Sequence, residues 1–252
     1  MKTALITGAT SGFGRAIALR LAKLNYQIIV TGRRNILLQS LVQEVREKYD
    51  TSHIIALNFD IRDKAQCASA FDSLPSEYKK IDLLINNAGL AAGAAPFQEC
   101  LVDDFERMID TNVKGLLYIT KLIVPTMIEQ KSGLIINISS IAGIEVYPNG
   151  NVYSATKHAV NAITKGLRID LVRHNVRVSS ISPGMAETEF SIVRYHGDEE
   201  KAKNVYAGLV PLQAEDIADA VEYIVTRPEH VEICDIQINP TQQANTYISY
   251  RH

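Results

Sequence analysis

A serine, a tyrosine and a lysine in the middle of the chain have the types and the spacing for proton transfer. Tyr153 and Lys157 stand four residues apart in a stretch with helical periodicity, so both side chains would lie on one helix face. A phenol has a pKa of about 10 and is a poor acid or base near neutrality, unless a neighbouring ammonium stabilises the phenolate. Lys157 is placed to do this, and the hydroxyl of Ser140 could hydrogen-bond a substrate oxygen. These three residues predict interconversion of an alcohol and a carbonyl compound.

The amino-terminal segment predicts a dinucleotide site. An apolar run at residues 2–7 leads into the turn Gly-Ala-Thr-Ser-Gly-Phe-Gly at residues 8–14, and a stretch with helical apolar periodicity follows. Glycines in such a strand, turn and helix let the backbone approach a pyrophosphate, which the free N–H groups and the positive end of the helix dipole would hold. The spacing Gly-x-x-x-Gly-x-Gly differs from the commoner Gly-x-Gly-x-x-Gly fingerprint.

Strand and helix patterns alternate along the whole chain. Further β-branched apolar runs lie at residues 27–31, 53–58, 81–85, 134–138, 176–181 and 233–238, with helical patterns between them. Parallel strands need crossover connections, which bury both faces of the sheet. Without a linker or repeat, the chain predicts one doubly wound α/β domain over residues 1–252, with a mostly parallel seven-stranded sheet. Ligands of such sheets bind beyond the carboxyl ends of the strands.

Composition argues against several classes of protein. The 26 basic and 28 acidic residues give a formal charge of −2, so no global basic field favours binding to nucleic acid. Cys67, Cys100 and Cys234 are few and odd in number, which disfavours a disulfide framework or a cysteine-rich zinc site, and we expect no metal. No apolar run approaches the roughly 20 residues that span a bilayer, and no targeting signal is visible. We expect a cytoplasmic protein without a membrane partner.

Six separated motifs resemble the short-chain dehydrogenase/reductase family. They are Thr7-Gly8-x-x-x-Gly12-x-Gly14, Asn86-Asn87-Ala88-Gly89, Asn112, Ser140, Tyr153-x-x-x-Lys157 and Pro183-Gly184. The resemblance implies a single Rossmann-type domain and hydride transfer with a nicotinamide cofactor. It also implies a catalytic tetrad of Asn112, Ser140, Tyr153 and Lys157, in which Asn112 holds a water that relays protons. Ser140 rather than Ser139 has the family's spacing to the tyrosine. His158 would point about 100° away from Lys157 on a helix, as a packed or solvated side chain.

The end of the second predicted strand favours NADP over NAD. Thr31-Gly32-Arg33-Arg34 lacks the acidic residue that would bind the adenosine 2′-hydroxyl, and arginine suits a 2′-phosphate. By resemblance, Asp60 and Ile61 lie against the adenine, although Asp60 could instead cap a helix, a role for which Asp63 competes. The predicted cofactor-binding residues are Gly8, Ser11, Gly12, Phe13, Gly14, Arg33, Arg34, Asp60, Ile61, Asn87, Ala88, Gly89, Tyr153, Lys157, Pro183, Gly184 and Thr188.

Substrate choice should depend on the loop region at residues 185–212. Parts of this region and of the later chain are similar to a subgroup of NADP-dependent 3-hydroxy acid dehydrogenases that act on serine, allo-threonine and related acids. The similar segments are residues 189–198, 201–202, 205–206, 227–231 and 240–242. Arg194 would then pair with the substrate carboxylate, or else be a solvated or subunit-contact arginine. Glu145 would disfavour an anionic substrate if it pointed inward. A broad ketone or aldehyde reductase and a non-catalytic NADP-binding protein are the alternatives.

The family resemblance also implies a homotetramer or a dimer, with the homotetramer expected, and its interface would include the apolar face of the helix that carries Tyr153 and Lys157. The polar tail at residues 239–252 could cap the site or reach a neighbouring subunit.

Overall fold

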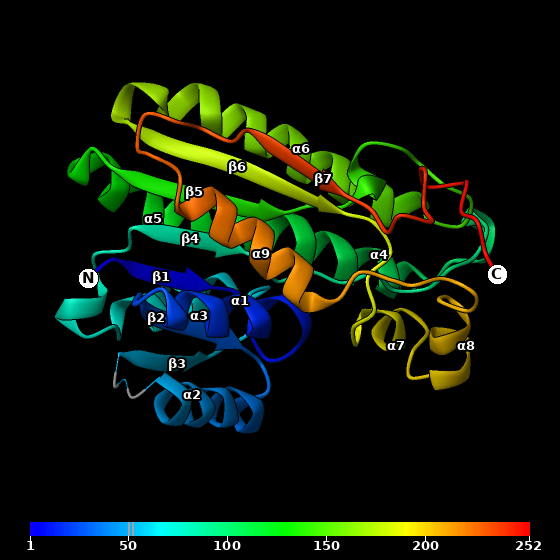
Figure 1. The fold of residues 1–252 in the computed structure, drawn as a ribbon, viewed down its shortest axis with the longest axis horizontal. Coiled ribbons are helices and arrows are strands. Elements are labelled where there is room, and N and C mark those ends of the chain that lie inside the picture. Colours follow the sequence, from blue (N-terminus) through cyan, green and yellow to red (C-terminus); the bar gives the residue numbers. More distant parts are fainter. Residues whose placement is uncertain (50, 52) are drawn as a thin grey trace.

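A seven-stranded parallel sheet runs through the computed structural model, which describes residues 1–49, 51 and 53–252 (Figure 1). Its order is β3-β2-β1-β4-β5-β6-β7, and each neighbouring pair is parallel. The prediction of a doubly wound sheet is confirmed, and the sheet is wholly rather than mostly parallel. The strands are β1 (Thr3–Ile6), β2 (Gln27–Gly32), β3 (Ile54–Asn58), β4 (Leu83–Asn86), β5 (Gly133–Ile138), β6 (Val176–Pro183) and β7 (Asp235–Ile238).

Helices cover both faces of the sheet. One face carries α1 (Gly12–Lys23), α2 (Asn35–Tyr49) and α9 (Ala214–Val225), and the other carries α3 (Lys64–Asp72), α5 (Leu116–Gln130) and α6 (Asn151–Leu171). Helix α4 (Val102–Ile109) packs on α6. Two short helices, α7 (Phe190–Arg194) and α8 (Glu199–Asn204), lie beyond the carboxyl ends of the strands (Figure 1). No helix in the described part of the chain is long and apolar enough to cross a membrane.

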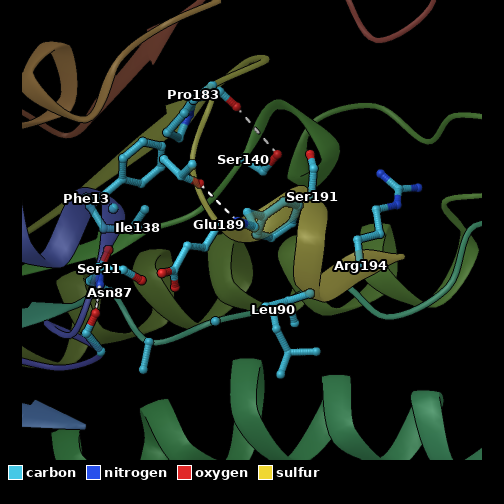
Figure 2. Close-up of a pocket in the computed structure, with 18 of the residues that line it drawn as sticks. Ser11, Phe13, Asn87, Leu90, Ile138, Ser140, Pro183, Glu189, Ser191 and Arg194 are labelled. Atoms are coloured by element: carbon cyan, nitrogen blue, oxygen red, sulfur yellow. Dashed lines mark hydrogen bonds between the residues drawn. The ribbon is translucent and has the colours of Figure 1, made fainter. Parts of the chain in front are cut away.

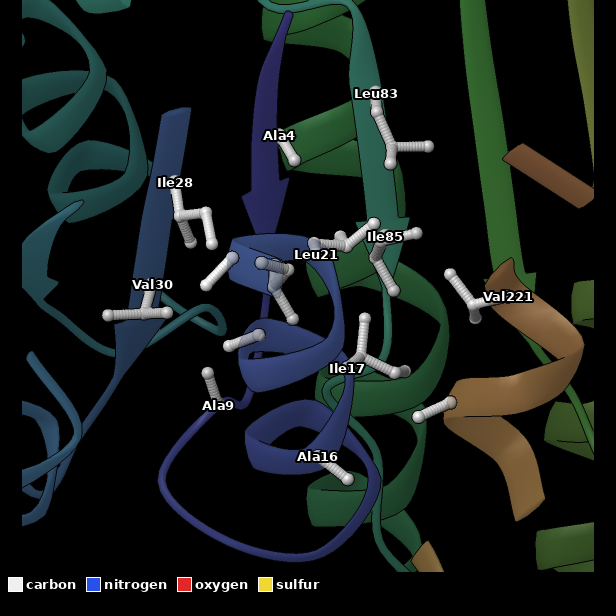
Figure 3. Packing of buried hydrophobic residues seen from close by; sticks show 14 of the residues in the cluster. Ala4, Ala9, Ala16, Ile17, Leu21, Ile28, Val30, Leu83, Ile85 and Val221 are labelled. Atoms are coloured by element: carbon white, nitrogen blue, oxygen red, sulfur yellow. The ribbon is translucent and has the colours of Figure 1, made fainter. Parts of the chain in front are cut away.

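Alternate residues of each central strand point into opposite cores, as the two-residue period of a strand requires. Ala4 and Ile6 pack against α1 and α9, whereas Leu5 between them packs against α5. On the first face, Ile17 of α1 lies between the sheet and Val221 of α9 (Figure 3). Because both faces are buried, the strands read as continuous apolar runs in the sequence.

A buried polar network fixes the helix that carries the tyrosine and the lysine. Asn86 at the end of β4 donates hydrogen bonds to Thr120 of α5 and to Asn137 of β5, each at 2.9 Å. Asn137 donates in turn to Thr164 of α6 at 2.8 Å. Each such bond contributes about 1 kcal/mol, and leaving one of these groups unpaired would cost more. Strand β4, strand β5 and α6 are thereby held in one register beneath the site.

Candidate active site

A cavity of about 540 Å³ opens at the carboxyl ends of the strands. It brings together most of the site residues predicted from the sequence. These are Gly8, Ser11, Gly12, Phe13, Arg33, Arg34, Asp60, Ile61, Asn87, Ala88, Gly89, Ser140, Tyr153, Lys157, Pro183, Gly184, Thr188 and Arg194. Gly14 and Asn112 do not line the cavity and support its wall from behind. Ser11 and Arg194 lie toward opposite ends, with Ser140 between them (Figure 2).

The glycine-rich turn is built so tightly that only glycine fits at two positions. Gly8 has a φ of 67°, and a Cβ there would lie 2.8 Å from the Cα of Ala88. A Cβ on Gly14 would lie 2.5 Å from both the carbonyl oxygen of Gly8 and the amide nitrogen of Asn87. That Asn87 side chain donates to the carbonyls of Thr7 and Gly8. The turn after β1 and the turn after β4 therefore lock together and leave backbone exposed to a ligand.

Two arginines stand at the end of β2, where the sequence predicts them. Arg33 is exposed, and its contact with a carboxylate of the described residues is a distant one, 3.9 Å to Asp60. Arg34 donates from Nη2 to the hydroxyls of Thr10 and Ser11. The alternative role of Asp60 as a helix cap is wrong, because Asp63 accepts from the first N–H groups of α3.

Tyr153 and Lys157 are buried side by side on α6. The Lys157 Nζ lies 5.9 Å from the centre of the Tyr153 ring and donates to the Ile138 carbonyl at 2.9 Å. Burial lowers the pKa of Lys157 to about 8. Burial, with a contribution from Tyr147, also raises the pKa of Tyr153, although the Ser140 hydroxyl acts in the opposite direction. The two side chains are neighbours as predicted, but stabilisation of the phenolate by Lys157 stays a prediction.

Asn112 lies in a π-helical turn, η3 (Asp110–Gly115), between α4 and α5. Its amide group accepts from the N–H of Leu90 and donates to the Leu90 carbonyl, both at 2.8 Å, and it also donates to Thr156. A Cβ on Gly89 would lie 3.3 Å from Asn112 Oδ1 and 3.4 Å from Lys157 Nζ. The wide turn thus brings Asn112 and Lys157 against the same short backbone segment, and such turns are frequent at functional sites.

Arg194 lies at the far end of the cavity from the glycine turn (Figure 2). Its guanidinium stands over the ring of Tyr147, 5.4 Å from the ring centre, and its Nε donates to the Gly93 carbonyl. No carboxylate of residues 1–49 and 53–252 lies within 4.0 Å of it. Glu145 does not line the cavity, and its carboxylate accepts hydrogen bonds from the N–H and the hydroxyl of Thr246. Glu145 is therefore not part of the cavity wall, and the condition under which it would repel an anionic substrate is not met.

Residues 2–198 match the family model described as short chain dehydrogenase. The chain belongs to the short-chain dehydrogenase family. It is 44% identical over 242 residues to serine 3-dehydrogenase of Agrobacterium fabrum, covering 96% of this chain and 95% of the relative. It is also 44% identical over 241 residues to the NADP-dependent 3-hydroxy acid dehydrogenase of Salmonella typhi, covering 95% of each. Among solved structures, the closed form of serine dehydrogenase complexed with NADP+ matches at 41% identity and a TM-score of 0.93, covering 99% of each chain.

In this short-chain dehydrogenase, Ser139 and His158 are the sequence neighbours of Ser140 and Lys157. Ser139 is buried and donates to the Lys157 carbonyl, whereas Ser140 lies beside the Tyr153 phenol. His158 does not line the cavity, and its Nδ1 bonds the Ser154 carbonyl one helical turn earlier. These positions agree with the choice of Ser140 and with a packed His158.

Several residues that line the cavity were not predicted from the sequence. The Phe190 ring meets the Tyr153 ring edge to face at 5.6 Å, and Tyr147 supports Arg194. Gln243 and Thr246 come from the tail, and Gln243 accepts from the N–H of Met185 at 2.7 Å. The tail of this dehydrogenase therefore lies over its own site. An isolated aromatic or glutamine carries no sequence signal for such a position, because the contact depends on how distant segments fold together.

Proposed function

We propose that this short-chain dehydrogenase transfers a hydride between NADP and a small 3-hydroxy acid of the serine, allo-threonine or 3-hydroxyisobutyrate type, or the corresponding carbonyl compound. One observation carries the proposal: a single cavity holds three groups of residues in succession. The glycine turn with Arg33 and Arg34 lies at one end, and Ser140, Tyr153 and Lys157 follow. Arg194, which has no carboxylate partner in the described chain, lies at the other end. The names of the two relatives support the substrate class, and the NADP+ complex of the solved neighbour supports the cofactor.

The cofactor end of the cavity fits NADP. Gly8 and Gly14 leave no room for a Cβ, so the turn offers backbone N–H groups to a pyrophosphate at the amino terminus of α1. Arg33 and Arg34 would take the 2′-phosphate, because a guanidinium binds phosphate oxygens in a planar fork. Asp60 and Ile61 would flank the adenine. When bound, the nicotinamide supplies the hydride chemistry.

Tyr153 would carry the proton. In the direction of oxidation, its phenolate oxygen removes the hydroxyl proton of the substrate while the Ser140 hydroxyl holds the same oxygen. Lys157 would favour the phenolate electrostatically and bind the ribose, and Asn112 with a water would pass the proton outward. Reduction reverses the proton transfers. Burial raises the pKa of the free Tyr153 phenol, so the phenolate depends on positive charge brought close to it.

Arg194 would hold the carboxylate of the substrate. The Tyr147 ring stacks against the guanidinium, and the Gly93 carbonyl accepts from its Nε. The side chain is therefore already ordered, and it loses little freedom when an anion binds. The loop region at residues 185–212, which carries Arg194, would serve as the substrate loop of a single domain that spans residues 1–252.

Tyr153→Phe tests the chemical role directly. The change removes only the hydroxyl, so NADPH should still bind, and turnover should fall by roughly 10²- to 10⁴-fold, the range typical of general acid–base catalysis. NADPH affinity is measured by fluorescence titration and turnover by absorbance of the reduced nicotinamide. Retention of full turnover in this variant would refute Tyr153 as the proton carrier.

A homotetramer in the cytoplasm would complete this proposal. The exposed apolar side chains Ile109, Leu117 and Ile169, on or beside the α4–α6 layer, support burial against further copies, and the free cysteines agree with a reducing compartment. Light scattering measures the assembly, and a monomer at micromolar concentration would contradict it.

A further inference from the structure

One acidic side chain in the cavity wall lies where phosphate groups are expected to bind. Glu189 stands at the N-cap position of α7 without a side-chain capping bond, and its carboxylate accepts a hydrogen bond from Nη2 of Arg34 at 2.8 Å. The Arg34 guanidinium lowers the pKa of Glu189, and the Ser11 hydroxyl adds to this effect, so the carboxylate stays ionised. Figure 2 shows the Glu189 side chain pointing toward Ser11 and away from Arg194. Neither the tetrad nor the substrate site requires this carboxylate.

The Arg34–Glu189 pair joins two walls of the cavity that are far apart in sequence. Arg34 follows β2, whereas Glu189 belongs to the loop after β6. Within the described chain it is the one ion pair that links the first three strands and their loops to residues 185–212. The side chain of Thr188 lies 3.3 Å from the Cβ position of Gly12, so the loop rests directly on the glycine turn.

The far end of the same loop is attached elsewhere. The Arg194 carbonyl accepts from the N–H of Gly93 at 2.9 Å, and His196 lies 3.1 Å from the buried carboxylate of Asp104. At the phosphate end of the cavity, the ion pair that attaches the loop is the exposed Arg34–Glu189 pair. Exposed ion pairs are weak because water competes for both partners, so this attachment can open readily.

The pair and a bound phosphate can coexist. The cavity of about 540 Å³ is present with the pair formed, and both residues line it. Arg34 uses Nη2 for Glu189, while its Nη1 has no acceptor among the described residues. Arg33 also keeps most of its donors free, with Asp60 no nearer than 3.9 Å. A 2′-phosphate can therefore take Arg33 and the free Nη1 of Arg34 while Glu189 stays in place.

We propose that Glu189 is a positioning residue that clasps Arg34 and closes the loop over the phosphate end of the NADP site, so that it sets how long the cofactor stays bound. The inference rests on the proposed NADP site. Glu189 touches no reacting atom, and its removal should change cofactor release far more than the chemical step.

Glu189→Gln keeps the shape of the side chain and removes its charge. An exposed pair of this kind is worth up to about 1 kcal/mol, so NADPH should leave the variant about three- to fivefold faster. Release is followed by stopped-flow fluorescence, with bound NADPH displaced by excess NADP+. Because solvent ions screen exposed charges, the difference from the unchanged protein should shrink as salt rises. Glu189→Asp should restore part of the slow release.

Glu187→Gln is the matched control. Glu187 lies two residues earlier, is exposed, does not line the cavity and has no side-chain ion pair among the described residues, so its change should leave release unaltered. Release from Glu189→Gln that equals that of the unchanged protein would overturn the clasp. Slower release would also overturn it, by showing that the carboxylate competes with the phosphates. Failure of the unchanged protein to bind NADPH would instead refute the proposed cofactor.

Discussion

Replacing Lys157 with methionine should stabilise the fold near neutral pH while it removes activity. Lys157 is 5% exposed, and burial lowers its pKa from the ordinary 10.5 to about 8. At about 1.36 kcal/mol per pKa unit, the buried charge costs about 3 kcal/mol below pH 8. Methionine also loses the hydrogen bond to the Ile138 carbonyl, worth about 1 kcal/mol. The variant should therefore be more stable at pH 7 by about 1 to 2 kcal/mol.

The titration of Lys157 makes the stability of the fold depend on pH with a definite sign. Between pH 8 and 10.5 the unfolded lysine binds a proton that the folded one has lost, so stability of the unchanged protein rises with pH in this window. The gain should reach about 3 kcal/mol, and Lys157→Met should lack it. Urea unfolding followed by circular dichroism at pH 7, 8, 9 and 10 measures the free energy of unfolding of both proteins. The contributions of all other titrating groups cancel in the difference between the two.

Lys165→Met provides the control for this experiment. Lys165 is exposed on the same helix, and its change should alter stability by no more than about 0.5 kcal/mol at any of these pH values. A Lys157→Met protein that is less stable at pH 7, by an amount that does not change up to pH 10, would refute the reasoning from the buried charge.

Three further changes test other parts of the site. Arg33→Asp should turn the cofactor preference from NADP toward NAD, by repelling a 2′-phosphate and offering a carboxylate to a 2′-hydroxyl; unchanged kcat/KM ratios for the two cofactors would contradict the assignment. Gly14→Ala should lower the free energy of unfolding by about 2 kcal/mol or more, because its Cβ would lie 2.5 Å from backbone. Gly166→Ala, with nothing within 4 Å of its Cβ, should instead raise the free energy of unfolding by about 0.5 to 1 kcal/mol. Thermal or urea unfolding measures both changes. Arg194→Ala should raise KM for 3-hydroxy acids by 10-fold or more, at roughly the 1.5 to 3 kcal/mol of a charged hydrogen bond, and leave KM for neutral alcohols nearly unchanged; an equal rise for both classes would remove its carboxylate role.

The sheet could be predicted closely from the sequence because its signals are local. Each predicted strand lies within two residues of an observed one, since a strand buried on both faces must be apolar along its length. The cavity could be placed because parallel strands end at the same edge, where Gly8, Ser140 and Pro183 meet.

Contacts between distant segments could not be predicted in this way. The Arg34–Glu189 pair spans 155 positions, and Thr246 meets Glu145 across 101. No period or spacing encodes either contact, because both depend on how the loop and the tail fold over the finished sheet. The π-helical turn at Asn112 was missed for a related reason: a helical apolar pattern does not show where the backbone widens by one residue.

Initial rates of NADPH formation test the central claim most directly. L-serine, D-serine, 3-hydroxyisobutyrate, 3-hydroxypropionate and a neutral secondary alcohol are each offered with NADP+ and with NAD+. We expect NADP+-dependent oxidation of at least one of the acids, with a higher kcat/KM than that of the neutral alcohol, and loss of this activity in Tyr153→Phe. Turnover of the neutral alcohol alone would contradict the 3-hydroxy acid assignment, and no turnover of any substrate would contradict the catalytic one.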